Sequence, residues 1–348
     1  MNTSTLVDAY AAPAPKAPLE KIRIPRRAVG DHDVRIDISY SGICHSDVLQ
    51  VEGAWGGGSF PMVPGHEFTG VVSATGAGVT RFAVGDRVGV GTLVDSCREC
   101  AFCLAGEPTY CRSSVLTYGG YEADGTPTHG GYSTGVVVDE NYVVRVPDAL
   151  DLAKAAPLMC AGITVYAPLK RFGVGPGTKI AVLGMGGLGH LAVKMAVALG
   201  AEVTVLSRTL GKRDDGLAYG AVDYRATEDP ATLTDLADHF AIIVSTVSAS
   251  LNFDHVLGLL AFDGALVNLG VPDGPISMSM FPIIMGRRSF TSSAAGSLTE
   301  TQEMLDFCAA HGIETEIETI EAAYVNTAYE RLNKGDVRYR FVIDNATI

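Results

Sequence analysis

The first 150 residues alternate short apolar and polar stretches in a way that is typical of β-strands. Residues 34–38, 70–74 and 87–90 are rich in valine and isoleucine and are separated by glycine and aspartate, which favour turns. A proline-rich segment, residues 11–18, precedes them and is expected to be a surface lead-in. The pattern predicts an irregular β-rich domain or barrel.

After about residue 150, the pattern changes to apolar strands that alternate with helices. A helix is expected at residues 190–199, and apolar strands are expected at residues 179–183, 202–206, 241–244 and 265–269. Strands that alternate with helices indicate a parallel sheet covered on both faces.

The pattern of the C-terminal segment resembles that of the first domain, with a helix expected at residues 299–311 and a last strand at residues 339–343. The chain is therefore predicted to be an α/β protein with two domains. A Rossmann domain, a doubly wound parallel sheet at residues 151–290, is inserted into a discontinuous β-rich domain formed by residues 1–150 and 291–348.

Composition argues against several kinds of partner. The chain has 348 residues, of which 47% are hydrophobic, and a formal net charge of −13. This charge argues against nucleic acid and anionic membrane surfaces. No apolar run reaches the roughly 18 residues of a membrane span, and the N-terminus lacks a signal-peptide pattern. We therefore expect a cytoplasmic protein that acts on a small molecule.

A glycine-rich segment follows the first predicted Rossmann strand and opens the predicted helix. It matches G-x-G-x-x-G with one additional glycine and consists of Gly184, Met185, Gly186, Gly187, Leu188 and Gly189. In this context the glycines permit a tight turn and let the backbone approach a pyrophosphate, while the helix N-terminus offers N–H groups to the phosphates. The alternative is a tight turn without a ligand.

The end of the second Rossmann strand indicates which dinucleotide binds. An acidic residue there would bind the ribose 2′-hydroxyl of NAD. The chain instead has Ser207, Arg208 and Thr209, followed by Lys212, and no carboxylate before Asp214. Hydroxyls and cations suit a 2′-phosphate, so the sequence favours NADP(H). The alternative is that these cations form only a solvated helix start.

Four of the seven cysteines form the strongest local signal in the chain. Cys97, Cys100, Cys103 and Cys111 place four thiols within fifteen residues, which is enough for a closed tetrahedral zinc site of the structural type. An iron–sulfur cluster is the rival interpretation. The bacterial ferredoxin run, however, continues with three residues before Cys-Pro, whereas seven residues separate the last two cysteines here.

Cys44, His66 and Cys160 are candidates for a second metal site. Two thiolates and one imidazole with an open fourth position are a catalytic zinc arrangement. Taken alone, Cys160 is more often a buried thiol and His66 a core histidine, so the spacing does not decide the matter.

Taken together, the motifs resemble those of the zinc-containing medium-chain alcohol dehydrogenases, in particular the cinnamyl alcohol dehydrogenase family and its bacterial NADP-dependent relatives. The matching motifs are residues 42–47 (GICHSD) and 64–67 (PGHE), the four-cysteine segment, and residues 184–190 and 337–343. The resemblance runs from about residue 40 to the C-terminus. It implies a GroES-like fold for the discontinuous domain, two zinc ions per chain, NADP(H) as the cofactor, and a homodimer formed through an edge of the Rossmann sheet.

The resemblance also implies roles for individual residues. Cys44, His66 and Cys160 correspond to the catalytic zinc ligands. Ser46 corresponds to the hydroxyl that relays the alcohol proton, and Glu67 to a glutamate that can ligate zinc when substrate and water are absent. Asp47 corresponds to the carboxylate that orients the ligand histidine; the alternative for Asp47 is a simple turn carboxylate.

Four further residues are expected to bind the cofactor, namely His45, Thr246, Gly270 and Arg340. For His45 the alternative is a structural or solvent-facing role. Leu49 departs from the family pattern, because close relatives often carry a histidine there at the outer end of the proton relay. The route of the proton beyond Ser46 therefore stays open.

The expected reaction is zinc-assisted hydride transfer between NADP(H) and an alcohol/aldehyde pair, chiefly the reduction of aromatic or aliphatic aldehydes. One alternative is an NADPH-dependent reductase of a conjugated C=C or iminium bond on the same scaffold. Such relatives tend to lose the relay hydroxyl or a zinc ligand, both of which are present here. A second alternative is an inactive relative with a binding role, against which the complete ligand set argues.

Overall fold

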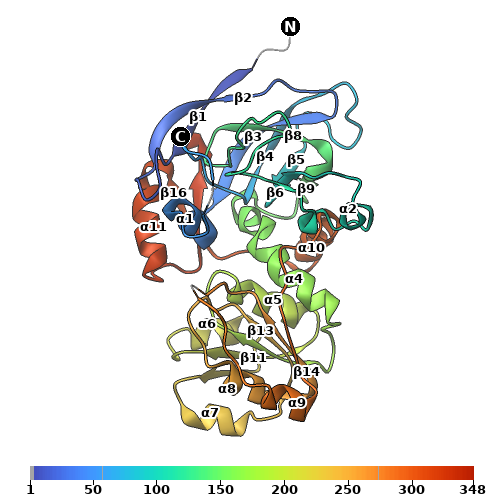
Figure 1. Cartoon of the computed structure of the whole chain (residues 1–348), viewed down its shortest axis with the longest axis vertical. Helices are drawn as coiled ribbons and strands as arrows, with labels where there is room; N and C mark the ends of the chain where they lie inside the picture. The colour runs from blue at the N-terminus through green and yellow to red at the C-terminus, as the bar shows by residue number, and fades with distance from the viewer. Residues whose placement is uncertain (1–3, 57, 273) are drawn as a thin grey trace. The chain divides into compact units, whose positions relative to one another are not determined.

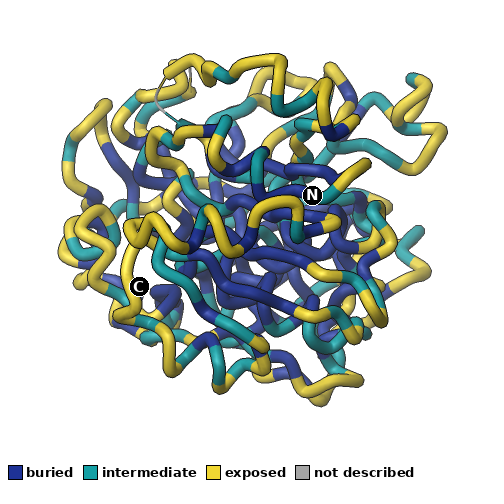
Figure 2. The backbone as a smooth tube through the Cα atoms, turned by 90° about the horizontal axis from the view of Figure 1, so that it is seen from below, coloured by how far each residue is buried: buried dark blue, intermediate teal, exposed yellow. Residues whose placement is uncertain are grey.

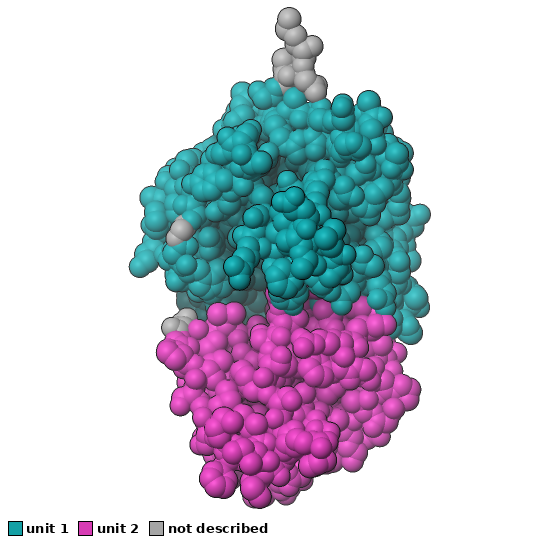
Figure 3. Space-filling view, turned by 45° about the vertical axis from the view of Figure 1, so that its right-hand side comes forward, with its two compact units in different colours: residues 1–163, 297–348 teal, residues 164–296 magenta. Residues whose placement is uncertain are grey.

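The computed structural model describes residues 4–56, 58–272 and 274–348, and the chain divides into two compact units (Figure 3). Unit 1 consists of residues 1–163 and 297–348, and unit 2 of residues 164–296. The predicted insertion of one domain into another is thus present. The boundaries differ from the expected ones, because residues 151–163 belong to unit 1 and residues 291–296 to unit 2.

A mostly antiparallel sheet is the frame of unit 1. Its strands follow the order β16 (Ile317–Glu321), β17 (Arg340–Asp344), β3 (Asp33–Gly42), β4 (Phe68–Thr75), β5 (Arg87–Val90) and β9 (Val144–Arg145), and β8 (Gly135–Asp139) also pairs with β3. The apolar side chains of Val34, Ile36 and Phe68 are fully buried in one core of this unit. The alternation of apolar and polar residues therefore predicted β3, β4 and β5, whereas β8, β9 and β16 were not anticipated.

An N-terminal hairpin joins unit 1 where the sequence suggested only a lead-in. β1 (Thr5–Ala11) pairs antiparallel with β2 (Glu20–Arg26). Ala11 and Ala12 are buried, and Ala12 exchanges two backbone hydrogen bonds of 2.8 and 2.9 Å with Met62. The expectation of a surface lead-in was therefore wrong for the start of residues 11–18.

The remaining elements of unit 1 are a short ribbon and several helices. The ribbon consists of β6 (Leu93–Asp95) and β7 (Val115–Leu116). The α-helices are α1 (His45–Glu52), α2 (Ala101–Leu104), α3 (Leu152–Ala155), α10 (Leu298–His311) and α11 (Val325–Asn333). The 3₁₀-helices are η1 (Pro108–Tyr110), η2 (Glu140–Tyr142), η3 (Ala156–Met159), η4 (Ala322–Tyr324) and η5 (Asn345–Thr347).

Unit 2 is a parallel six-stranded sheet with the strand order of a Rossmann fold. The order is β12 (Asp223–Ala226), β11 (Glu202–Ser207), β10 (Lys179–Leu183), β13 (Phe240–Ser245), β14 (Leu260–Asn268) and β15 (Ser289–Thr291). The chain order reverses between β10 and β13, and such a switch point is where open α/β sheets bind ligands.

The helices of unit 2 are α5 (Gly189–Ala198), α6 (Arg213–Ala218), α7 (Pro230–Asp235), α8 (Phe253–Gly258) and α9 (Phe281–Gly286), and α4 (Ala161–Arg171) runs into this unit from unit 1. Strands β11, β13 and β14 and helices α6, α7, α8 and α9 of this unit are labelled in Figure 1. The buried segments gather in the interior and exposed loops surround them (Figure 2). Among the described residues no single helix could cross a membrane; only the pair Leu152–Met159 and Ala161–Arg171, bent by 58°, has the length and composition for it.

Candidate active site

Three elements of unit 1 bring the candidate catalytic ligands together. Cys44 is the N-cap residue of α1, His66 lies just before β4, and Cys160 ends the 3₁₀-helix η3. Their ligand atoms, with a carboxylate oxygen of Glu67, all lie within 4.8 Å of one another, and His66 Nε2 is 3.2 Å from Cys160 Sγ. Residues spread over more than 100 positions therefore converge on one point.

The two thiols of this cluster affect each other's ionisation. Hydrogen bonding with Cys160 lowers the pKa of the Cys44 thiol well below its usual value, with a further contribution from His66. The same partnership, together with burial, raises the pKa of Cys160. One thiolate is thus stabilised by the proton of the other, and a divalent cation between them would allow both to ionise.

Glu67 and Arg340 form a buried ion pair beside the thiols. Glu67 is fully buried and Arg340 is 3% exposed, and Arg340 Nη2 donates to Glu67 Oε1. Burial raises the pKa of Glu67 to about 8. The second carboxylate oxygen, Oε2, has no hydrogen-bond partner. A buried carboxylate oxygen without a partner, next to two thiols and an imidazole, fits a zinc ion as the missing partner.

Arg340 was expected to bind the cofactor, and in unit 1 its guanidinium is engaged with Glu67, 273 residues away in sequence. The pairing of these two side chains was not anticipated. Nothing in the local sequence around residue 340 indicates it, because Arg340 begins β17 and Glu67 precedes β4, two strands that lie on either side of β3 only in the folded sheet.

Asp47 lies behind the ligand histidine with all of its acceptor capacity used. His66 Nδ1 is 2.9 Å from Oδ1, which also accepts from the Gly65 backbone N–H at 3.2 Å. Oδ2 accepts from the Cys44 N–H at 2.9 Å and from the Tyr132 hydroxyl at 3.2 Å. A carboxylate that accepts from one imidazole nitrogen leaves the other nitrogen to face a metal.

The first turn of α1 holds the other expected residues of this site. Ser46 Oγ is 3.6 Å from Cys44 Sγ, and its residue is half-buried. His45 is exposed and Leu49 is half-buried on the same helix. The structure therefore places Ser46 next to the metal-ligand cluster, and Leu49 provides no ionisable group beside it.

A second cluster consists of the four cysteines at 97, 100, 103 and 111. All four Sγ atoms lie within 4.8 Å of one another, with separations of 3.9 Å for Cys97–Cys103, 3.6 Å for Cys100–Cys103 and 3.5 Å for Cys111–Cys97. A tetrahedral site with zinc–sulfur bonds of about 2.3 Å has sulfur atoms about 3.8 Å apart. Backbone N–H groups lower the pKa of Cys97 to about 7, which favours its thiolate. The donors and spacing fit a closed structural zinc site.

The nucleotide-binding loop in unit 2 has the expected form. It joins β10 to α5, and a Cβ on Gly189 would lie 2.0 Å from the Gly184 carbonyl oxygen, so only glycine permits this approach. Lys212 Nζ donates to the carbonyl of Met185 in the loop at 2.8 Å. Thr246, which follows β13, donates to the carbonyl of Leu183 at 3.2 Å. The loop and Thr246 thus lie together at the switch point of the sheet.

The segment expected to bind the 2′-phosphate follows β11 in the same unit. Ser207 is the last residue of β11 and is half-buried, while Arg208 and Thr209 are exposed. The backbone of Gly270 lies against that of Val247, since a Cβ on Gly270 would be 2.0 Å from the Val247 carbonyl oxygen. His190 is fully buried, and its Nδ1 is 3.1 Å from the Gly186 carbonyl oxygen.

Comparison with known proteins assigns this chain to one family. The model of the alcohol dehydrogenase GroES-like domain matches residues 30–148, and that of the zinc-binding dehydrogenases matches residues 187–310. An NADP-dependent alcohol dehydrogenase C 1 from Mycolicibacterium smegmatis is 56% identical over 344 residues, which are 98% of this chain and 99% of that protein.

Solved structures are similar over the same length. A cinnamyl alcohol dehydrogenase from Sorghum bicolor has a TM-score of 0.96 and 43% identity and covers 98% of both chains. CAD from Helicobacter pylori, complexed with NADP(H), has a TM-score of 0.93 and 39% identity and covers 99% of both chains. The chain belongs to the zinc-binding alcohol dehydrogenase family, on the branch that resembles the cinnamyl alcohol dehydrogenases. The sequence-based prediction of family and fold is confirmed.

Proposed function

We propose that this chain is a zinc-dependent oxidoreductase that transfers a hydride between NADP(H) and an alcohol/aldehyde pair, chiefly as an aldehyde reductase of aromatic and aliphatic scope. The convergence of Cys44, His66 and Cys160 beside the unpartnered Oε2 of Glu67 is the observation that supports it most strongly. Three protein ligands and an exchangeable carboxylate suit a catalytic zinc rather than a structural one.

The chemistry of hydride transfer would be divided between the bound groups and the chain. Zinc, when bound, supplies Lewis-acid polarisation of the substrate oxygen, and NADP(H) supplies or accepts the hydride. Cys44, His66 and Cys160 hold the metal, and Asp47 keeps the His66 imidazole in the orientation that leaves Nε2 facing it. Ser46, 3.6 Å from Cys44 Sγ, is the hydroxyl that moves the alcohol proton.

Glu67 has a separate part in this scheme. Arg340 binds one oxygen of the Glu67 carboxylate, which leaves the other oxygen for a fourth metal contact when no substrate occupies that position. The second metal site, formed by Cys97, Cys100, Cys103 and Cys111, is proposed to be structural because all four of its positions are filled by thiols.

NADP(H) is the proposed cofactor because Ser207, Arg208, Thr209 and Lys212 follow β11 where an NAD enzyme would carry an acid. His45, the loop from Gly184 to Gly189, Thr246, Gly270 and Arg340 remain the other proposed cofactor contacts. The relative from Mycolicibacterium smegmatis, described as NADP-dependent, and the Helicobacter pylori complex with NADP(H) support the same cofactor here.

A homodimer through the sheet edge of unit 2 is part of the proposal. β15 is the last strand at one side of the sheet, and the α9 side chains of Phe281, Ile284 and Met285 are 74%, 65% and 74% exposed. An exposed strand edge with an apolar patch beside it favours pairing with a second copy. Localisation in the cytoplasm stays a prediction.

Replacing one metal ligand tests the proposed reaction. Cys44→Ser is expected to lose one of two zinc ions per chain and aldehyde-dependent NADPH oxidation, while NADPH binding and the far-UV circular dichroism spectrum stay unchanged. Cys308→Ala, which changes a buried thiol of α10 outside both clusters, is the control and should keep both zinc ions and activity. Unchanged turnover in Cys44→Ser would refute the proposal.

A further inference from the structure

Two tyrosines that the proposed reaction does not use surround the pair formed by Asp47 and His66. Asp47 is fully buried and accepts four hydrogen bonds, two on each oxygen. Two of the donors are backbone N–H groups and one is His66 itself. The Tyr132 hydroxyl, at 3.2 Å, is the fourth. A carboxylate has about four lone-pair sites, and the Tyr132 hydroxyl occupies one of them, while the Tyr118 hydroxyl also interacts with this carboxylate.

The backbone holds Tyr132 at a fixed place relative to the ligand histidine. The segment before Tyr132 is hydrogen-bonded to the segment before His66, through Gly131 N–H to the Gly65 carbonyl at 2.8 Å and Tyr132 N–H to the Pro64 carbonyl at 3.0 Å. A Cβ on Gly65 would lie 2.7 Å from the Tyr132 ring, so the two segments are in close contact. Tyr132 is fully buried and does not need to be ordered when a ligand binds.

Tyr118 contacts the ligand histidine directly. Its ring is stacked on the His66 imidazole, with centroids 5.9 Å apart and an interplanar angle of 26°. Tyr118 is 7% exposed and follows β7, where Thr117 N–H donates to the Thr92 carbonyl at 3.1 Å. The stacked ring therefore limits rotation of the imidazole about the Cβ–Cγ bond of His66.

We propose that Tyr132 and Tyr118 are positioning residues for the metal ligand His66: Tyr132 fixes the Asp47 carboxylate that orients the imidazole, and Tyr118 fixes the plane of the ring. This inference rests on the proposed metal site at Cys44, His66 and Cys160. Mutation of a residue that hydrogen-bonds to a metal-binding histidine commonly lowers metal affinity or activity by 10- to 100-fold. Tyr132 acts on His66 through Asp47, so its replacement is expected to change the rate of zinc release by about tenfold, the lower end of this range.

Removing the Tyr132 hydroxyl leaves one acceptor site of Asp47 without a donor. The carboxylate then gains freedom to turn, and the imidazole loses part of its orientation toward the metal. A tyrosine that served only packing would tolerate the change to Phe, because the ring is kept, and would show no selective effect on one metal ion. Metal release therefore separates the two roles.

The test measures zinc release from the intact holoenzyme to a chromogenic chelator. The variants are Tyr132→Phe, Tyr118→Phe and Tyr118→Leu, with Tyr224→Phe as the control, since it removes a buried tyrosine hydroxyl from β12 of unit 2. Tyr132→Phe is expected to release one zinc per chain about tenfold faster than the wild type, while the other zinc leaves at the wild-type rate. Tyr118→Leu should also speed the release of that one zinc, and Tyr118→Phe, which keeps the stacked ring, should do so less.

The cobalt-substituted protein gives a second readout that does not depend on activity. The visible absorption of cobalt bound to Cys44 and Cys160 should shift in Tyr132→Phe and Tyr118→Leu and stay unchanged in Tyr224→Phe. Equal release rates in Tyr132→Phe and Tyr224→Phe, or equal acceleration of both zinc ions, would overturn the positioning role while the proposed function stands. Failure of the wild type to bind a metal at Cys44 would overturn both.

Discussion

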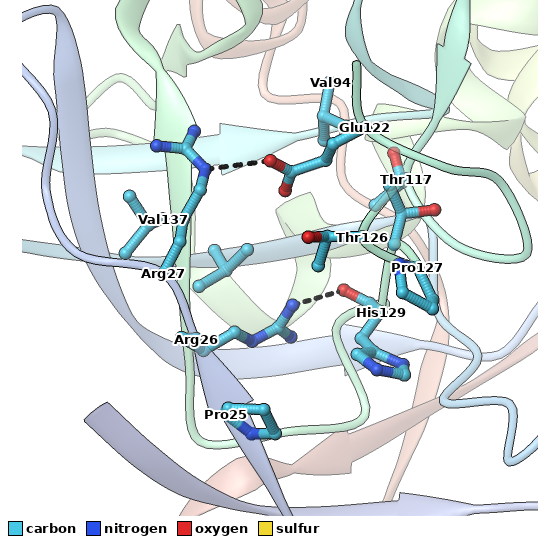
Figure 4. Close-up of a pocket in the computed structure, with 12 residues that line it drawn as sticks. Pro25, Arg26, Arg27, Val94, Thr117, Glu122, Thr126, Pro127, His129 and Val137 are labelled. Atoms are coloured by element: carbon cyan, nitrogen blue, oxygen red, sulfur yellow. Dashed lines mark hydrogen bonds and ion pairs between the residues drawn. The ribbon is translucent and has the colours of Figure 1, made fainter. Parts of the chain in front are cut away.

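At the scale of single residues, His129 shows how burial sets a pH response. It lies in a pocket beside β2, where the buried guanidinium of Arg26 donates to its backbone carbonyl at 2.7 Å (Figure 4). Burial, followed by the charge of Arg26, lowers the pKa of His129 from 6.5 to about 4. Between these values the unfolded chain binds a proton that the folded chain does not, so stability is full above pH 6.5 and falls as the pH drops toward 4.

Between pH 7 and pH 5, the thermal midpoint of His129→Gln should therefore fall by less than that of the wild type. Differential scanning fluorimetry at both pH values measures this difference. The exposed His255, replaced by Gln, is the matched control. A wild-type pH response in His129→Gln would contradict the argument from burial.

Ser207, at the end of β11, carries the prediction on cofactor preference. Ser207→Asp places a carboxylate where it can bind a ribose 2′-hydroxyl and repel a 2′-phosphate. The ratio of kcat/KM for NADPH to that for NADH should fall by roughly tenfold or more. Thr234→Asp, which adds the same charge on the exposed side of α7, should leave the ratio unchanged. An unaltered ratio in Ser207→Asp would count against NADP(H) recognition by this segment.

The sequence pointed to the metal-ligand candidates but not to the residues that support them. Cys44, His66 and Asp47 lie in short motifs that resemble those of the zinc-containing alcohol dehydrogenases, and this resemblance, rather than their spacing, singled them out. Tyr132, Tyr118 and the pairing of Arg340 with Glu67 had no local signal. Their roles depend on segments far apart in the chain, such as residues 64–66 and 130–132, which meet only in the folded domain.

At the scale of elements, α10 begins with a capping box. Ser297 Oγ accepts from the Glu300 backbone N–H at 3.3 Å, and the Glu300 carboxylate accepts from the Ser297 N–H at 2.8 Å. Ser297→Ala should lower the free energy of unfolding by about 1 kcal/mol, because the Glu300 backbone N–H in the first turn loses its side-chain acceptor. Thr299→Ala, in the exposed first turn, is the control. Equal urea midpoints for the two variants would show that the cap does not stabilise the fold.

Elements with strong apolar patterns were predicted closely, and those with weak patterns were not. The strands at residues 87–90 and 179–183 begin and end as expected. β1 was missed because its buried positions are Val7, Ala9 and Ala11, and alanine is a weak strand former. Pairing with β2 and a hydrogen bond of 2.8 Å from Tyr10 N–H to the Tyr132 carbonyl hold this strand instead.

At the scale of the whole molecule, the chain order predicted an insertion but not its boundaries. Residues 151–163 were assigned to the Rossmann domain because the pattern of the sequence changes after about residue 150. In the structure they belong to unit 1, where α3 and η3 pack against the strands of the larger sheet and present Cys160. This segment, which carries the candidate metal ligand Cys160, packs against unit 1, and a pattern of hydrophobicity along the chain does not reveal that contact.

The assembly gives a prediction at the same scale. Met285→Glu puts a charge on the apolar surface of α9, so the proposed homodimer should dissociate into monomers. Sedimentation velocity measures the change directly. Val84→Glu, on an exposed loop of unit 1 where the side chain is 64% exposed, should stay a dimer. A monomeric wild type, or a dimeric Met285→Glu variant, would contradict pairing through this face.

The central claim is that Cys44, His66 and Cys160 bind one zinc ion. X-ray diffraction from crystals of the purified protein, recorded on both sides of the zinc absorption edge, tests it most directly. We predict two anomalous peaks per chain, one among the four cysteines of the structural site and one about 2.3 Å from the Cys44 and Cys160 sulfurs and about 2.1 Å from His66 Nε2. A peak at the four-cysteine cluster with none at Cys44 would contradict the account.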